Sequence, residues 1–193
     1  MESKENSFYA KSRKAWRTWL TNNSLSTSNI WLIIYHKNSK KTSLTYDDAV
    51  EEALCFGWID SIPNKRDTES YYLFFSQRKP KSNWSKANRE RAERMIKSKQ
   101  MTKKGLEMVN FAKENGTWLA LKDVQASIVP DDLKRVLKKN KIANQNFEKF
   151  SPSSKRIILE WILNAKKEET RLKRITETVE LAEKGIKANH YRQ

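Results

Sequence analysis

The sequence predicts an α+β fold, in which a small antiparallel sheet is covered by helices and is followed by an all-helical C-terminal subdomain. Three short β-rich runs, at residues 30–36, 58–62 and 71–76, all lie in the first half of the chain. Segments with helical spacing of apolar residues separate them, and beyond Pro130 every segment has that spacing. We therefore expect an α+β core over residues 1–125 and a helical subdomain over residues 130–187.

Each element expected in the first half has a local signal. In the first helix Trp16, Trp19 and Leu20 share one face, as an amphipathic helix requires. Thr45 is a suitable N-cap for the second helix, and Gly57 can adopt the left-handed conformation that ends it. The expected elements are, in order, a helix over 8–22, a strand over 30–36, a helix over 46–57, strands over 58–62 and 71–76, and helices over 83–97 and 103–114.

The second half is predicted to contain only helices, over residues 131–139 and 144–150 and then over a long span opened by Ser151 and Pro152. Glu168 falls on the apolar seam of the long span, so we expect a break near residues 166–168. The seam consists of Ile158, Trp161, Ile162, Ala165, Leu172, Ile175, Val179 and Ala182.

Composition limits the class of protein. Seven Trp, seven Phe and six Tyr in a chain that is 37% hydrophobic indicate that aromatic rings carry much of the packing. No apolar run is long enough for a membrane span, and the N-terminus lacks the apolar core of a signal peptide. We therefore expect a cytoplasmic protein, in which the single cysteine, Cys55, forms no internal disulfide.

The net charge of +16 would attract nucleic acid, anionic lipid or phosphorylated small molecules. Residues 78–104 contain eleven Lys and Arg against two Glu. On the helix over 84–97 many of these charges are spaced i,i+4 on an outer face, which is typical of a solvated surface. The inner face is unusual because Asn88 and Arg91 lie beside Trp84, and buried polar groups need partners.

Asp60 is the acidic residue best suited to pair with Arg91. The two could form an internal ion pair, or they could line a ligand-binding cleft. The segment from Arg78 to Asn83 is a second candidate for phosphate or carboxylate binding, because it combines cations with a helix N-terminus; its alternative role is a solvated loop. The candidate cleft comprises Trp58, Asp60, Arg78, Lys79, Ser82, Asn83, Trp84, Asn88 and Arg91.

Other chemistries have little support in the sequence. The four glycines are scattered, so there is neither a P-loop nor a dinucleotide fingerprint, and we expect no cofactor. His36 and His190 have no partners at metal-ligand spacing, so we expect no metal site. Cys55 follows an apolar stripe and is expected to be a core thiol. Catalysis through Asp60 or Glu52 is conceivable, but nothing in the sequence singles out a catalytic residue, which favours a non-enzymatic protein.

Three segments resemble the YdeI/OmpD-associated family, also called bacteriocin-protection proteins. They read YDDAVEEALCFGWIDSI, RKPKSNWSKANRERAERMI and LEWILNAKKEETRLKRITETVELAEKG. Gln77 departs from the proline expected there before the Arg-Lys pair. The third segment supplies a C-terminal motif that could contact the N-terminal core or an anionic partner: Lys166, Thr170, Arg171 and Arg174.

The resemblance implies a cytoplasmic binding protein for an anionic small molecule or an acidic protein partner, linked to envelope stress and to protection from bacteriocins or cationic antimicrobial peptides. A strongly cationic chain cannot neutralise cationic peptides by charge attraction, so such protection would be indirect. Two alternatives stay open. One is weak, non-specific nucleic-acid binding through residues 84–97 and 166–174, and the other is an unrecognised enzyme with a Trp/Asp/Arg cleft.

Overall fold

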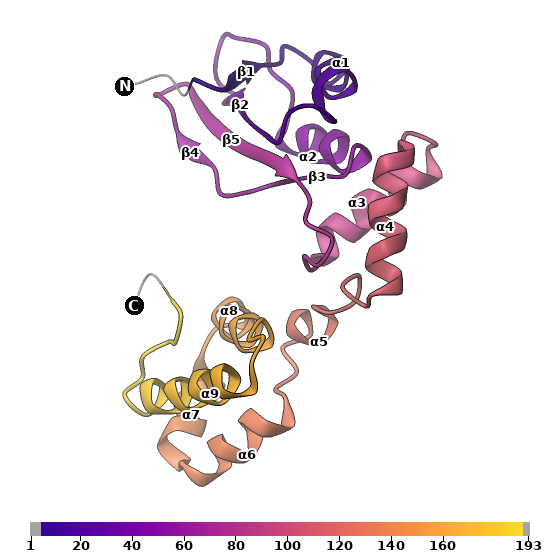
Figure 1. The fold of residues 1–193 in the computed structure, drawn as a ribbon. Helices are drawn as coiled ribbons and strands as arrows, with labels where there is room; N and C mark the ends of the chain where they lie inside the picture. Colours follow the sequence, from indigo (N-terminus) through magenta and orange to yellow (C-terminus); the bar gives the residue numbers. More distant parts are fainter. Residues whose placement is uncertain (1–4, 191–193) are drawn as a thin grey trace. The chain divides into compact units, whose positions relative to one another are not determined.

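The computed structural model of the chain describes residues 5–190. The chain forms two compact units, Met1–Leu119 and Ala120–Gln193, which we call unit 1 and unit 2 (Figure 1). Unit 1 combines a sheet with helices, and the described part of unit 2 is helical. The fold class is therefore α+β, as the sequence predicts.

The sheet of unit 1 is mixed, whereas the sequence analysis expected an antiparallel one. Its strands run in the order β1-β2-β5-β3, and β4 also pairs with β5. The strand β1 lies parallel to β2, and the other pairs are antiparallel. The first helix was expected to begin at residue 8, but residues 8–9 belong to β1, where pairing with β2 determines their conformation. The strands are β1 (Ser7–Tyr9), β2 (Asn29–Tyr35), β3 (Trp58–Asp60), β4 (Asn64–Lys65) and β5 (Ser70–Gln77).

The helices of unit 1 begin at side-chain caps that the sequence displays. Thr45 and Asp48 form a reciprocal capping box at α2, and the hydroxyls of Ser85 and Thr102 accept hydrogen bonds from the first turns of α3 and α4. The helix expected to start near Asn83 begins instead at Lys86. The four helices are α1 (Arg13–Asn23), α2 (Tyr46–Cys55), α3 (Lys86–Lys97) and α4 (Lys103–Glu114).

The two faces of the sheet differ in their neighbours. One face packs on the helices: Phe75 contacts Trp16 of α1 with ring centroids 5.3 Å apart, and Leu32 and Leu73 are fully buried there. Figure 1 shows α1 and α2 on the same side of the sheet. We call the opposite face the outer sheet face, and none of its large side chains belongs to the hydrophobic core of unit 1. They are Tyr9, Trp31, Ile33, Tyr35, Tyr72 and Phe74.

A network of ion pairs joins α1 to α2. Glu52, only 2% exposed, accepts hydrogen bonds from Arg13 Nε at 2.6 Å and from Arg17 Nη1 at 2.7 Å. Arg13 also pairs with Asp48 and Glu51. Burial alone would lower the pKa of Arg13, but the Glu52 carboxylate and its neighbours raise it above the ordinary value. The acidic face of α2 is therefore occupied by structural contacts.

The end of α2 is in close contact with the start of α4. The carbonyl of Cys55 accepts hydrogen bonds from the backbone N–H and the hydroxyl of Thr102, at 3.1 and 2.6 Å. Gly105 makes this approach possible, because a Cβ at that position would lie 2.2 Å from the Cys55 carbonyl oxygen. Gly57 follows with φ +74°, the left-handed conformation expected for it.

Unit 2 has a core of its own, centred on Leu133, Phe147, Ile158, Ile162 and Ile175. The expected break in the long C-terminal helix is confirmed, because one helix ends at Leu163 and the next begins at Glu168. The exposed fraction of Leu172 is 56%, however, so its place on the buried seam was a wrong prediction. The helices are α5 (Lys122–Gln125), α6 (Asp131–Lys139), α7 (Lys141–Lys149), α8 (Pro152–Leu163) and α9 (Glu168–Glu183).

Among residues 5–190, no helix is both long enough and apolar enough to span a lipid bilayer.

Candidate functional site

Arg78 is the most unusual polar residue of the predicted cleft. Its side chain is 5% exposed, and its guanidinium carbon lies 3.8 Å from the centroid of the Trp84 ring. Nη2 donates to the backbone carbonyl of Asn83, but Nε and Nη1 are buried without a hydrogen-bond partner. Burial lowers the pKa of Arg78 to about 10, and the charge of Asp60 acts in the opposite direction. The guanidinium therefore closes the loop after β5 and retains two donors.

The two tryptophans of the predicted cleft are core residues. Trp58 is 1% exposed, donates from its indole nitrogen to the carbonyl of Ser24 at 3.2 Å, and meets Trp19 edge to face. Trp84 is 2% exposed and contacts Trp118, with ring centroids 4.9 Å apart. Neither ring is available to a ligand without rearrangement. Sequence reasoning identified their proximity to Arg78 but not the depth of their burial.

Asp60 and Arg91 do not pair with each other, and Tyr46 lies between them. The Tyr46 hydroxyl donates to Asp60 Oδ2 at 2.6 Å, and the Arg91 guanidinium carbon lies 5.7 Å from the centroid of the Tyr46 ring. Arg91 binds Asp47 and, at 3.0 Å, Asn88 Oδ1. Partial burial and the bond to Asp60 raise the pKa of Tyr46. The ion pair considered from the sequence is therefore absent, and both side chains instead contact a tyrosine that sequence reasoning did not include.

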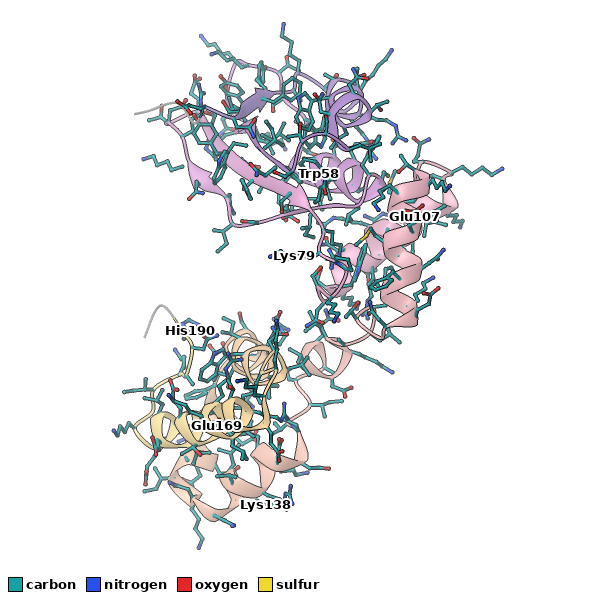
Figure 2. All side chains as sticks on the ribbon, in the orientation of Figure 1. Trp58, Lys79, Glu107, Lys138, Glu169 and His190 are labelled. Carbon is teal, nitrogen blue, oxygen red and sulfur yellow. The ribbon has the colours of Figure 1, made fainter. Side chains whose placement is uncertain are left out.

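The rest of the loop between β5 and α3 is an exposed turn. Ser82 donates from its hydroxyl to the carbonyl of Lys79 at 2.7 Å, which holds the turn closed. Lys79 itself is exposed, and Figure 2 shows it projecting from unit 1, whereas Trp58 lies inside. Asn83 contributes its carbonyl to Arg78. This loop presents two exposed lysines, Lys79 and Lys81, whereas Arg78, the third cation of the predicted segment, is buried.

Several cations of the basic helix α3 contact other segments of unit 1. Arg94 pairs with Glu51 of α2 at 2.8 Å, in place of the expected i,i+4 partner on its own helix. Arg89 donates to the carbonyl of Trp118 at 2.9 Å. The expected i,i+4 pair between Lys86 and Glu90 is present but long, at 3.8 Å. Arginines that make internal contacts leave α3 a weaker nucleic-acid surface than its composition indicates.

The C-terminal motif serves the packing of unit 2. Arg171 binds Asp132 through two hydrogen bonds of 2.6 and 3.1 Å, and this bond lowers the pKa of Asp132. Arg174 donates to the carbonyl of Trp161 and stacks on its ring at 5.0 Å. Thr170 is half-buried and Lys166 is exposed. Both arginines therefore hold α9 to α6 and α8.

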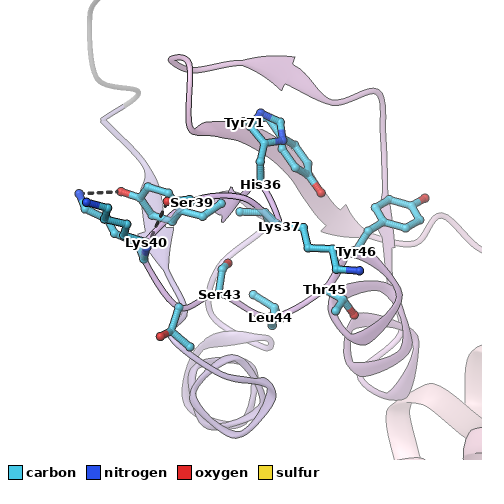
Figure 3. A pocket seen from close by; sticks show the side chains of 13 residues that line it. His36, Lys37, Ser39, Lys40, Ser43, Leu44, Thr45, Tyr46 and Tyr71 are labelled. Carbon is cyan, nitrogen blue, oxygen red and sulfur yellow. Dashed lines mark hydrogen bonds between the residues drawn. The ribbon is translucent and has the colours of Figure 1, made fainter.

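A pocket of about 650 Å³ lies at the end of the sheet, beside the loop that joins β2 to α2. Figure 3 shows His36 and Tyr71 together at the top of the view, with Ser39 and Lys40 on one side and Thr45 and Tyr46 on the other. A second pocket of about 370 Å³ shares three of these residues and extends along β4. The residues common to both pockets are His36, Tyr46 and Tyr71.

The lining of this double pocket is cationic. It contains Lys37, Lys40 and Lys41 from the loop and Lys65 from β4, and it contains no carboxylate. Lys41 donates to the Tyr35 hydroxyl at 3.2 Å, and this bond raises the pKa of Lys41. In the part of the chain that the structure describes, the other three lysine amines form no ion pair.

Sequence reasoning treated the loop over residues 37–43 as a polar turn and missed this pocket. Three lysines in five positions were visible, but the rings that complete the walls come from β5 and α2, which only the fold brings together. Ser43 adds a buried hydroxyl without a hydrogen-bond partner. The pocket therefore offers positive charge, hydroxyl groups and flat ring surfaces within a single concavity.

Comparison with known proteins gives two family matches and no closer relative. Residues 8–108, just over half of the chain, match a domain of unknown function (DUF8412). Residues 126–185 match the family described as bacteriocin-protection, YdeI or OmpD-associated. Neither the curated proteins nor the solved structures contain a significant match.

The boundary between the two matches falls near the boundary between the two units. The motifs around Asp60 and Arg78, which the sequence analysis related to the YdeI/OmpD-associated family, lie within the first match, and the motif around Arg171 lies within the second. Residues 126–185 are thus similar to the bacteriocin-protection, YdeI or OmpD-associated family, and the chain belongs to the DUF8412 family, whose model matches more than half of it.

Proposed function

We propose that the protein binds an anionic small molecule that carries a flat ring, in the double pocket of unit 1. The observation that carries the proposal is the pocket lining, in which four lysines and three shared ring side chains occur without a carboxylate. An anion in such a concavity meets three lysines that form no ion pair in the described chain, Lys37, Lys40 and Lys65, beside Lys41, which donates to the Tyr35 hydroxyl. The rings of His36 and Tyr71, whose centroids are 5.4 Å apart, form a wall suited to a planar group.

The residues predicted from the sequence take a supporting part in this proposal. Asp60 accepts a hydrogen bond from the Tyr46 hydroxyl, and the Arg91 guanidinium lies over the Tyr46 ring. Asp60 and Arg91 therefore hold Tyr46, a wall of the pocket, in place without lining the pocket themselves. The acids nearest the helix N-terminus are already engaged, because Asp48 binds Arg13 and Thr45, and Asp47 binds Arg91. The helix end can therefore contribute its positive dipole to the pocket with less opposition from these side chains.

A link to bacteriocin protection is a further part of the proposal, supported by the family description that matches residues 126–185. A cytoplasmic location and a link to antimicrobial-peptide protection belong to the proposal through the sequence resemblance alone. The net charge of +16 argues against direct capture of cationic peptides. Any protection would follow from binding of the anionic ligand. A non-enzymatic role is favoured because the buried carboxylate of Glu52 is committed to two arginines.

The test pairs anionic probes with neutral counterparts, for instance AMP with adenosine and benzoate with benzamide, in titration calorimetry. We expect the anions to bind and their counterparts to bind at least about tenfold more weakly, because each charge-assisted hydrogen bond contributes about 1.5–3 kcal/mol. The double variant Lys37→Gln/Lys40→Gln should lose this preference. The control variant Lys14→Gln/Lys97→Gln removes the same charge from exposed positions outside the pocket and should retain it.

Equal losses in the two double variants would show that overall charge alone attracts the probes, which would contradict a site at the pocket. Failure of both anions to bind the wild-type protein would contradict the proposed ligand class.

A further inference from the structure

The outer sheet face carries five aromatic side chains, of which only Tyr35 also lines the anion pocket. Residues directly opposite each other in neighbouring strands lie on the same face, and the register pairs Trp31 with Phe74 and Ile33 with Tyr72. Tyr9 of β1 lies opposite Ile33, so three adjacent strands contribute rings. The strands themselves contain no charged residue. Partly exposed aromatic surfaces of this kind are typical of binding sites.

The rings form two contacting groups on this face, one of three rings and one of two. The centroid of Trp31 lies 4.7 Å from that of Phe74 and 6.0 Å from that of Tyr72, and Tyr9 meets Tyr35 edge to face at 5.2 Å. Four of the five side chains are half-buried, and Tyr72 is buried beneath its neighbours. Parts of several rings therefore reach solvent on a rigid support, at the two-residue spacing of a β-strand.

Cations stand at the margin of these rings. The guanidinium carbon of Arg66 lies 5.8 Å from the centroid of the Tyr72 ring, and the Lys41 amine lies 5.1 Å from that of Tyr35. Asp67, the acid that contacts Arg66, also accepts hydrogen bonds from the Ser70 hydroxyl and from the Glu69 backbone. Asp67 thus offsets the charge of Arg66, and Glu69 acts on Lys41, so the margin carries both signs of charge within a chain of net charge +16.

Aromatic rings on a sheet with cations at its margin suit a ligand that presents both flat faces and negative charge. Unpaired bases of a single-stranded nucleic acid stack on such rings, and their phosphates meet the cations. In a duplex the base faces are covered, so a duplex could use only the charge. We propose that the outer sheet face binds single-stranded nucleic acid, with bases stacked on Trp31 and Phe74 and phosphates beside Lys41 and Arg66.

This proposal differs in location from nucleic-acid binding by the basic segments. On α3 and α9 the arginines Arg91, Arg94, Arg171 and Arg174 bond within their own units, so their charge is largely committed. The outer sheet face also provides stacking, which those helices do not. The proposal shares Tyr35 and Lys41 with the lining of the double pocket, but its stacking residues Trp31 and Phe74 lie outside that lining, and its test uses a different probe and different variants.

The test measures fluorescence anisotropy of a labelled oligothymidylate dodecamer and of a duplex of equal length with the full-length protein. We expect the single strand to bind at least about tenfold more tightly than the duplex at moderate salt, because only the single strand can stack. The variant Trp31→Leu/Phe74→Leu keeps the surface apolar and should weaken single-strand binding at least about tenfold. The control Phe111→Leu removes a 41% exposed ring on α4 and should bind as the wild type does.

A second measurement does not depend on the stability of the double variant. Photocrosslinking of the wild-type protein to a dodecamer containing 5-iodouracil should label peptides of β2 or β5. Labelling confined to α3 or to unit 2, equal affinity for single strand and duplex, or no binding would each overturn the proposal. So would sedimentation showing a dimer that the double variant converts to a monomer, because a second copy would then cover the face.

Discussion

Replacement of Glu52 by Gln should destabilise unit 1 substantially. The carboxylate is 2% exposed and accepts one short hydrogen bond from each of Arg13 and Arg17. Removing one partner of a buried ion pair costs about 3–5 kcal/mol. The side chains of both arginines are roughly a third exposed, and Arg13 retains two other acids, so solvent and these partners recover part of that loss. We therefore expect a loss of about 2–3 kcal/mol at neutral pH.

Urea denaturation followed by circular dichroism measures this loss, and Glu107→Gln is the matched control. Glu107 lies in the same unit, but its side chain is 51% exposed and its pair with Lys104 is 3.4 Å long, so the control should change stability by less than about 0.5 kcal/mol. Equal midpoints for the two variants would refute the view that Glu52 is a structural hub. The double variant with Arg17→Gln should show a coupling energy of about 1 kcal/mol or more with Glu52→Gln.

Three further outcomes test other parts of the structure. Gly105→Ala should destabilise by more than about 2 kcal/mol in thermal melts despite its better helix propensity, because the new Cβ meets the Cys55 carbonyl; an unchanged melt would contradict that contact. Asp132→Asn should cost about 1 kcal/mol near pH 7, and progressively less as the pH falls below the ordinary aspartate pKa of about 3.9, because Arg171 lowers the folded-state pKa of Asp132. Denaturant titrations over a series of pH values from 7 downward measure this decline, and a cost that does not change with pH would contradict it. Burial raises the pKa of Cys55 to about 11, so a thiol reagent at mildly alkaline pH should modify it only after unfolding, and fast native modification would exclude a buried thiol.

Most elements of the fold were predictable because their signals are local. The capping residues Thr45, Thr102 and Ser151 each mark a helix start that the structure contains. The strand β1 was not predictable, because three residues carry too little periodicity and their partner β2 lies over twenty positions away. The prediction that Leu172 is buried was wrong for a related reason. Apolar spacing indicates a face of a helix but not how far the neighbouring helices extend over that face.

The candidate site was harder to predict than the fold. Sequence reasoning expected Asp60 and Arg91 to be partners because their charges are opposite and their segments adjacent. In the structure Asp60 instead binds Tyr46, and Arg91 binds Asp47. The positions of Tyr46 and Asp47 depend on how α2 lies against β3 and α3. The lysines of the pocket were visible but carried no motif. Their significance depends on the absence of acids around them, and that is a property of the folded surface.

The short strands at both margins of the sheet also bear on how the chain avoids aggregation. The segments NIWLIIY and SYYLFFSQ, which form β2 and β5, combine high β-propensity with no charge, as fibril-forming segments do. The free edge of β2 is covered by the three residues of β1, and that of β5 by β3 and β4. Strands this short offer little template to another molecule. Loss of β1 would therefore expose the unpaired backbone groups of β2. The expected result is intermolecular cross-β assembly at protein concentrations where the intact chain stays dissolved.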